Sequence, residues 1–210
     1  PDYELDEVQD VRLGDVVVSS SKENGGVVVY DFGRRLGDGS FQARYPLNQP
    51  PRSLRTALTR LETEHMLNES QVASFIEKAL TKYPKLRKKG GWVRPNQDSD
   101  RLFHAEYPHV GGRTCAECDK DYEIDRQEWE RHDTSPVIHY GTIATGSAVV
   151  KHAPTRTEIG KTHQAICLEM EAAGLMNAFP CLVIRGISDY ADSHKNDTWH
   201  NYAAVAASAC

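Results

Sequence analysis

The chain is poor in cysteine and in aromatic residues, and it contains no long apolar run. Its 210 residues include 5 cysteines, and aromatic residues make up 8%. An odd number of scattered cysteines argues against a disulfide scaffold and predicts a reducing compartment, the cytoplasm. No apolar run approaches the roughly 20 residues that span a bilayer, so we predict no membrane partner.

Basic character and several common catalytic signatures are also missing. The net charge of −5 gives no reason to expect a nucleic-acid partner. The sequence contains no phosphate-binding P-loop, no dinucleotide-binding glycine fingerprint and no Gly-x-Ser-x-Gly elbow. It begins at Pro1 without a methionine or a signal peptide, so we expect that a native N-terminus is missing.

Short apolar runs alternate with segments of helical periodicity along most of the chain. Strands are predicted at 11–19, 26–31, 137–144, 166–168 and 182–187, and helices at 51–65, 70–82, 155–163, 170–179 and 198–210. This alternation predicts a single α/β domain. Residues 33–52 carry glycine and proline and are predicted to form a loop.

Two polar stretches interrupt this pattern. The basic run 82–89 is predicted to be a solvated loop. Residues 94–135 are rich in Asp, Arg, His and Glu and poor in aliphatic residues, which predicts an insertion or a long functional loop.

Acidic and basic residues gather near two of the predicted strands. Glu169 and Glu171 begin a predicted helix, Arg185 lies in a short apolar strand, and Ser188 and Asp189 follow it. Open α/β sheets place ligands where such strands end. Carboxylates accept hydrogen bonds from vicinal hydroxyls, and an acid after a buried strand suits proton transfer. The same spacing also arises without a catalytic site, if Glu169 and Glu171 only begin a helix and Ser188 and Asp189 only cap one.

Three segments of this region together resemble the purine/uridine phosphorylase superfamily. They are HYGTIATGS (139–147), EMEAA (169–173) and RGISDYAD (185–192). Residues 10–33 also resemble the Val-Arg-x-Gly-Asp-Val-Val strand of that family. The resemblance is closest to the nucleoside-phosphorylase-like domains of fungal multidomain proteins. It implies an α/β fold with a mixed twisted central sheet flanked by helices.

The resemblance also implies roles for individual residues in cleaving a purine N-glycosidic bond. Asp189 would protonate or hydrogen-bond purine N7, and Ser188 would position Asp189. Glu171 would bind ribose hydroxyls, Met170 would pack on the sugar, and Arg185 would stabilise the nucleophile or Glu171. The remaining expected substrate-binding residues are Thr145 near the anion or nucleophile, Val149 and Val150 at the base pocket, and Gly146 and Glu169.

Several alternatives stay open at this point. The family's opening strands are absent, so residues 1–210 are expected to form one partial domain, incomplete at the N-terminus. Phosphorolysis and hydrolysis are both compatible with these residues, with inorganic phosphate as a possible co-substrate and no other cofactor. The family often forms homo-oligomers. A degenerate nucleoside- or nucleotide-binding sensor within a larger receptor-like protein is the alternative to an enzyme.

The 94–135 stretch allows two further interpretations. Cys115-x-x-Cys118, with His104, His109 and His132 nearby, suits zinc, but a lone CxxC is a weak signal, so no metal is assigned and reduced thiols are the alternative. Six basic residues would hold nucleotide phosphates if they converged, or would be solvated. They are Arg101, Arg113, Arg126, Arg131, Lys151 and Arg156.

Overall fold

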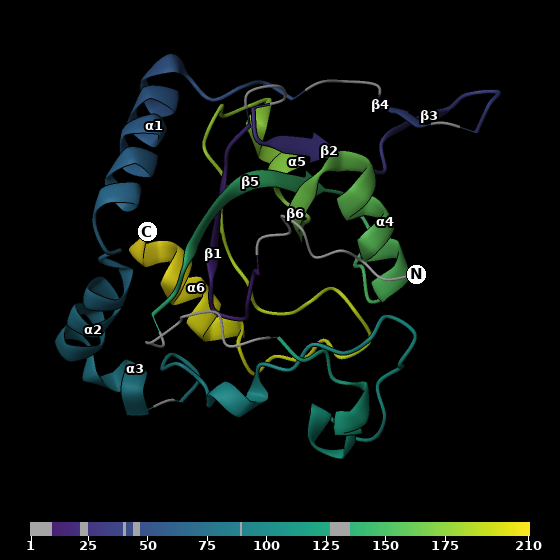
Figure 1. Ribbon diagram of the computed structural model, residues 1–210. Helices are drawn as coiled ribbons and strands as arrows, with labels where there is room; N and C mark the ends of the chain where they lie inside the picture. The colour runs from purple at the N-terminus through teal and green to yellow at the C-terminus, as the bar shows by residue number, and fades with distance from the viewer. Residues whose placement is uncertain (1–9, 22–24, 40, 44–46, 89, 127–134) are drawn as a thin grey trace.

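A curved mixed sheet forms the centre of the computed structural model, which describes residues 10–21, 25–39, 41–43, 47–88, 90–126 and 135–210 (Figure 1). The strands of this sheet are β1 (Val16–Ser19), β2 (Val27–Val29), β5 (Ile138–Thr145), β6 (Ala165–Glu169) and β7 (Ile184–Gly186). Short β-branched runs such as Val16–Ser19 form these strands because such side chains fit a buried pleated surface. The structure confirms the expected α/β fold with a mixed central sheet.

The long strand β5 organises the sheet because three strands pair with it. Its first half runs parallel to β1, with Val16 opposite Ile138. Its second half runs parallel to both β2 and β6, with a register irregularity between Thr142 and Ile143. Strand β7 pairs with β1 in the antiparallel sense. The order β2-β5-β1-β7, with β6 also on β5, makes the sheet mixed.

Helices cover the sheet on both sides (Figure 1). They are α1 (Arg52–Leu67), α2 (Val72–Lys82), α3 (Pro84–Lys88), α4 (Ala153–His163), α5 (Ala172–Met176) and α6 (His200–Ala209). Helix α6 packs on β7 and β1, α2 packs on α6, and α4 packs on β5 and β6. The contact between α6 and β7 is so close that a Cβ on Gly186 would lie 1.9 Å from the carbonyl oxygen of Ala203.

The buried core lies between the sheet and the α2–α6 layer. Val16, Val17 and Ile143 from the strands and Trp199 and Tyr202 around α6 are nearly or fully buried within it. A polar pair lies at its edge, where the carboxylate of Asp15 lies 2.9 Å from Nε2 of His139 and also accepts the backbone N–H of Val137.

Two local predictions differ from the structure. Strands β3 (Gly33–Arg35) and β4 (Phe41–Ala43) form an antiparallel hairpin within the segment that was predicted as loop. The basic run was predicted as loop but contains the short helix α3, because Pro84 suits a first helical position and Leu86 packs against the core.

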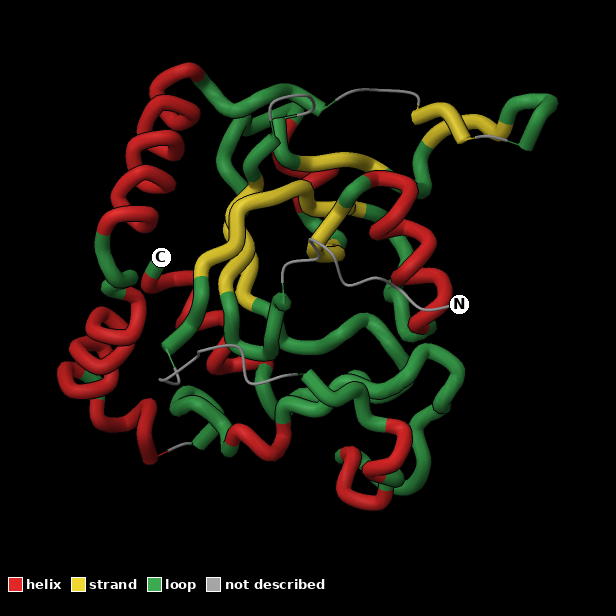
Figure 2. The backbone as a smooth tube through the Cα atoms, viewed as in Figure 1, coloured by secondary structure: helices red, strands yellow, loops and turns green. Residues whose placement is uncertain are grey.

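Of the polar 94–135 stretch, residues 94–126 lie along one end of the molecule (Figure 2). Its described part holds the 3-10 turns η1 (Gln97–Ser99), η2 (Cys115–Glu117) and η3 (Lys120–Tyr122), and Phe103 and Glu123 form an isolated antiparallel bridge. Within the described residues, no helix is long and apolar enough to cross a membrane.

Candidate functional site

The end of β6 places Glu169 and Thr145 side by side. Thr145 and Glu169 are partners in the β5–β6 register, and the N–H of Gly146 donates to the carbonyl of Glu169. The buried Glu169 carboxylate accepts the backbone N–H groups of Glu171 and Ala172 through Oε2, both at 2.9 Å. Its other oxygen, Oε1, is buried and has no hydrogen-bond partner among the described residues.

Thr145 is fully buried rather than open to solvent. Its hydroxyl oxygen accepts the N–H of Ala173, near the start of α5, at 3.3 Å. The side chains of Thr145 and Glu169 therefore both help to hold the first turn of α5.

Glu171 and Arg185 form an ion pair that faces solvent. Nη1 of Arg185 lies 3.0 Å from Oε2 of Glu171, and their side chains are 39% and 60% exposed. Met170 lies beside Glu171 in sequence and is also exposed. Glu171, Arg185 and Met170 thus expose a carboxylate, a guanidinium and an apolar side chain to solvent.

Asp189 lies after β7, where three donors face its carboxylate. The hydroxyl of Ser188 donates to Oδ2 at 3.0 Å, and Nζ of Lys195 donates to the same oxygen at 2.8 Å. The N–H of Ala191 donates to Oδ1 at 3.0 Å. Ser188 therefore contacts Asp189, as the resemblance implied, whereas Lys195 is a partner that the sequence did not reveal.

The two halves of the candidate site come from different ends of the sheet. Because β7 runs antiparallel to β1, Asp189 emerges near the start of β1, whereas Thr145 and Glu169 lie at the end of β5. Cys167 lies in β6, two residues before Glu169. Burial, foremost, raises the pKa of the Cys167 thiol to about 12, while the charge of Arg185 lowers it and those of Glu169 and Asp189 raise it.

The loop after β5 is fixed by residues that follow β2. A Cβ on Gly146 would lie 2.3 Å from the ring of Tyr30, so only glycine fits beneath that ring. The hydroxyl of Tyr30 donates to the carbonyl of Ala148 at 3.1 Å. Val149 is exposed and Val150 is half-buried on this loop, so Val149 is available for contact with a ligand.

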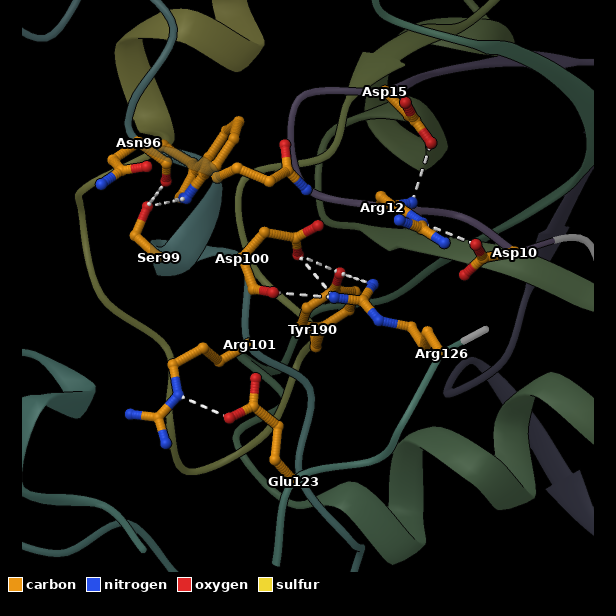
Figure 3. Close-up of polar contacts among 12 residues, drawn as sticks. Asp10, Arg12, Asp15, Asn96, Ser99, Asp100, Arg101, Glu123, Arg126 and Tyr190 are labelled. Carbon is orange, nitrogen blue, oxygen red and sulfur yellow. Dashed lines mark hydrogen bonds and ion pairs between the residues drawn. The ribbon is translucent and has the colours of Figure 1, made fainter. Parts of the chain in front are cut away.

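Three basic residues expected near the pocket turn inward and bind other parts of the protein. Arg126 donates to the hydroxyl of Tyr190 at 2.6 Å and lies 3.2 Å from the carboxylate of Asp100 (Figure 3). Arg156 donates to the carbonyl of Tyr190 at 2.8 Å, and Arg101 pairs with Glu123 at 2.9 Å.

The remaining basic residues behave differently. Arg113 and Lys151 are exposed, and Arg131 lies outside the described residues. Arg101, Arg126 and Arg156 therefore hold the structure together instead of forming an open phosphate site.

Tyr190 joins the insertion to the segment that carries Asp189. Its hydroxyl donates to Asp100, whose carboxylate is buried (Figure 3). Burial and the charge of Asp100 raise the pKa of Tyr190 well above its ordinary value. A cavity of about 10 Å³ adjoins this network, lined in part by Ser188, Asp189 and Tyr190. It has room for about one water, so a nucleoside requires space elsewhere or an opening of this segment.

The insertion also brings part of the suspected cysteine and histidine group together. His109, Cys115 and Cys118 present ligand atoms that all lie within 4.8 Å of one another. His104 is exposed and is not part of this group, and His132 lies outside the described residues.

Comparisons with known proteins found relatives much longer than this chain. It is 38% identical over 201 residues to a nucleotide-binding leucine-rich repeat (NLR)-like protein of Hyaloscypha variabilis, covering 95% of this chain and 19% of that protein. It is 36% identical over 77 residues to the ATP nucleosidase Cap17 of Escherichia coli, covering 34% of this chain and 15% of that protein. The chain thus spans a fifth or less of each relative. No family model and no solved structure matches it.

Proposed function

We propose that this domain hydrolyses the N-glycosidic bond of a purine nucleotide and releases the free base. The observation that carries the proposal is the solvent-facing pair of Glu171 and Arg185, 3.0 Å apart beside the exposed Met170. The similarity to a protein named ATP nucleosidase supports hydrolysis and a nucleotide substrate.

The sugar would bind at this pair. The carboxylate of Glu171 would accept hydrogen bonds from the ribose hydroxyls while its ion pair with Arg185 keeps it oriented. Met170 would pack against the sugar face. Thr145 and Glu169 would act as positioning residues. Their contacts hold the backbone from which Met170 and Glu171 project.

The base would leave with help from Asp189. As the bond between C1′ and N9 breaks, its electron pair passes to N9, and Asp189 delivers a proton to N7 so that the base leaves neutral. A water oxygen then bonds to C1′, and the proton that this water loses passes through solvent to the Asp189 carboxylate, which restores the acid for the next turnover. Nζ of Lys195 donates to the carboxylate of Asp189 at 2.8 Å, so the side chain of Lys195 must move away when the base binds there.

Phosphorolysis is the closest variant of this chemistry, with inorganic phosphate in place of water. Within the basic set expected to bind phosphate, Arg101, Arg126 and Arg156 are engaged in internal pairs, whereas Arg113 and Lys151 are exposed. The two exposed residues are the better candidates for a nucleotide's phosphates.

The test is quantification of free base by chromatography. The purified chain is incubated with ATP, adenosine and inosine, each with and without inorganic phosphate. Release from ATP without phosphate supports the proposal, and release that requires phosphate replaces hydrolysis with phosphorolysis. Asp189→Asn should lower the rate by about 10²–10⁴-fold while ATP binding persists. The matched control is Asp197→Asn, a change at an exposed aspartate nearby, which should leave the rate unchanged.

The second candidate function is a nucleotide-binding sensor. The observation that supports it is the similarity to an NLR-like protein over 95% of the chain. A sensor would bind ATP without releasing base. Asp189→Asn would then change neither turnover nor binding. That outcome in a folded protein would overturn the enzyme proposal.

A further inference from the structure

One short loop of the insertion gathers two cysteines and a histidine beside the candidate catalytic site, since Cys115 lines the same small cavity as Ser188 and Asp189. The ligand atoms of His109, Cys115 and Cys118 lie within 4.8 Å of one another, and Cys118 is buried. Bonds of about 2.0–2.3 Å around tetrahedral zinc place ligand atoms about 3.3–3.8 Å apart. A contraction of roughly 1 Å would therefore close these three groups around one ion.

The surrounding contacts already hold this loop in a ligating arrangement. The guanidinium of Arg101 donates to the carbonyl of Cys115, and to that of Cys118 at 3.1 Å, which fixes the turn between the two thiols. Nε2 of His109 lies 3.2 Å from the carbonyl of Thr114. Donation of Nε2–H to this carbonyl leaves Nδ1 with a free lone pair, and histidine metal ligands in general donate the N–H of the nitrogen that does not bind the metal.

A fourth side chain lies against this group, and the closest polar contact of its ring is a distance of 3.6 Å from Nδ1 to the carboxylate of Asp192. His194 is 6% exposed, and neither ring nitrogen has a hydrogen-bond partner among the described residues. Its ring centroid lies 5.5 Å from that of His109, and the thiol of Cys115 contacts its carbonyl oxygen. Burying an imidazole without partners is unfavourable, and a metal bond would remove that cost.

We propose that His109, Cys115, Cys118 and His194 form a structural zinc site. Two thiolates and two imidazoles are a donor set that tetrahedral zinc favours and that calcium and magnesium do not. His194 lies outside the group of three, so its ring reorients to complete the site. Asp192, whose Oδ1 lies 3.6 Å from Nδ1 of His194, would then orient that ring as an outer partner.

Such a site would fasten the insertion to the chain segment that follows Asp189. The loop already touches this segment, since the N–H of His109 donates to the hydroxyl of Ser193 at 3.0 Å. An ion held from both sides would add a much stronger connection between the two. Its role would be structural, because all four coordination positions are taken by side chains.

The first test measures metal directly and needs no substrate. We expect about one equivalent of zinc per chain by elemental analysis, removed by a strong chelator. Cobalt added to the stripped protein should give a thiolate charge-transfer band and intense tetrahedral d–d bands. Cys115→Ser and Cys118→Ser should lose the ion, and Cys181→Ser, at a half-buried thiol outside the group, should retain it. Absence of both zinc and the cobalt bands from the folded wild-type chain would overturn the proposal.

The second test concerns the fourth ligand. His194→Phe keeps a flat ring against Phe103, on which His194 stacks at 4.2 Å, and removes both ring nitrogens while enlarging the ring by one atom. Cobalt affinity should fall by at least about tenfold, and the d–d bands should change shape. Unchanged affinity and bands would overturn the assignment of His194. Because metal content and spectra are read without ATP, these results are independent of the proposed nucleosidase activity.

Discussion

The hydroxyl of Tyr190 is the best single point at which to test how the insertion is attached. It donates to Asp100 and accepts a hydrogen bond of 2.6 Å from Arg126. Hydrogen bonds to charged groups contribute about 1.5–3 kcal/mol each. Asp100 and Arg126 still face each other at 3.2 Å without the hydroxyl, which offsets part of the loss. Tyr190→Phe should therefore lower the free energy of unfolding by about 2 kcal/mol.

The measurement is urea and thermal unfolding of Tyr190→Phe beside Tyr83→Phe, a control at an exposed tyrosine. For a chain of this size, about 2 kcal/mol corresponds to a fall in Tm of about 4–8 °C. A double-mutant cycle with Asp100→Asn should give a coupling energy of about 1–2 kcal/mol. If Tyr190→Phe stayed within about 0.5 kcal/mol of the control, the network would not stabilise the fold and our reasoning would be wrong.

Three further experiments test other parts of the structure. Gly186→Ala should lower the free energy of unfolding by about 3 kcal/mol or more, because the new methyl group would clash with the backbone of α6. The control, Gly174→Ala, adds a methyl group into open space and should leave the free energy of unfolding nearly unchanged. The buried thiol of Cys167, whose pKa is raised to about 12, should resist alkylation at pH 8 while the half-buried Cys181 reacts, as peptide mass spectrometry would show. Glu171→Gln should raise KM for ATP about 10–100-fold, through loss of charged hydrogen bonds to ribose, and an unchanged KM would remove Glu171 from the sugar site.

Hydrophobic periodicity was sufficient to predict the elements that build the core. The apolar run at 137–144 corresponds to β5, and the periodic segment at 70–82 corresponds to α2. The short helix α3 was missed because three of its five residues are basic and its one core contact, Leu86, carries no periodic signal. The hairpin of β3 and β4 was missed because its strands are only 3 residues each.

The contacts of the candidate site were only partly predictable. Adjacent residues such as Ser188 and Asp189 were expected to touch, and they do. The inward turn of Arg126 onto Tyr190 joins residues 64 positions apart, and no local pattern reports such a contact. Lys195 was missed because a lone lysine in a polar segment is usually solvated. The expected homo-oligomer stays a prediction.

The pairing of β1 with β5 determines how this chain must fold. The carboxylate of Asp15, just before β1, binds the backbone of Val137, just before β5, across 122 residues of sequence. Such distant pairing slows folding, because the intervening chain loses conformational freedom before β1 can pair with β5. The cost grows only with the logarithm of loop length, at about 0.6 kcal/mol for each doubling. Related chains should therefore tolerate large changes in the length of the intervening segment while keeping the same sheet.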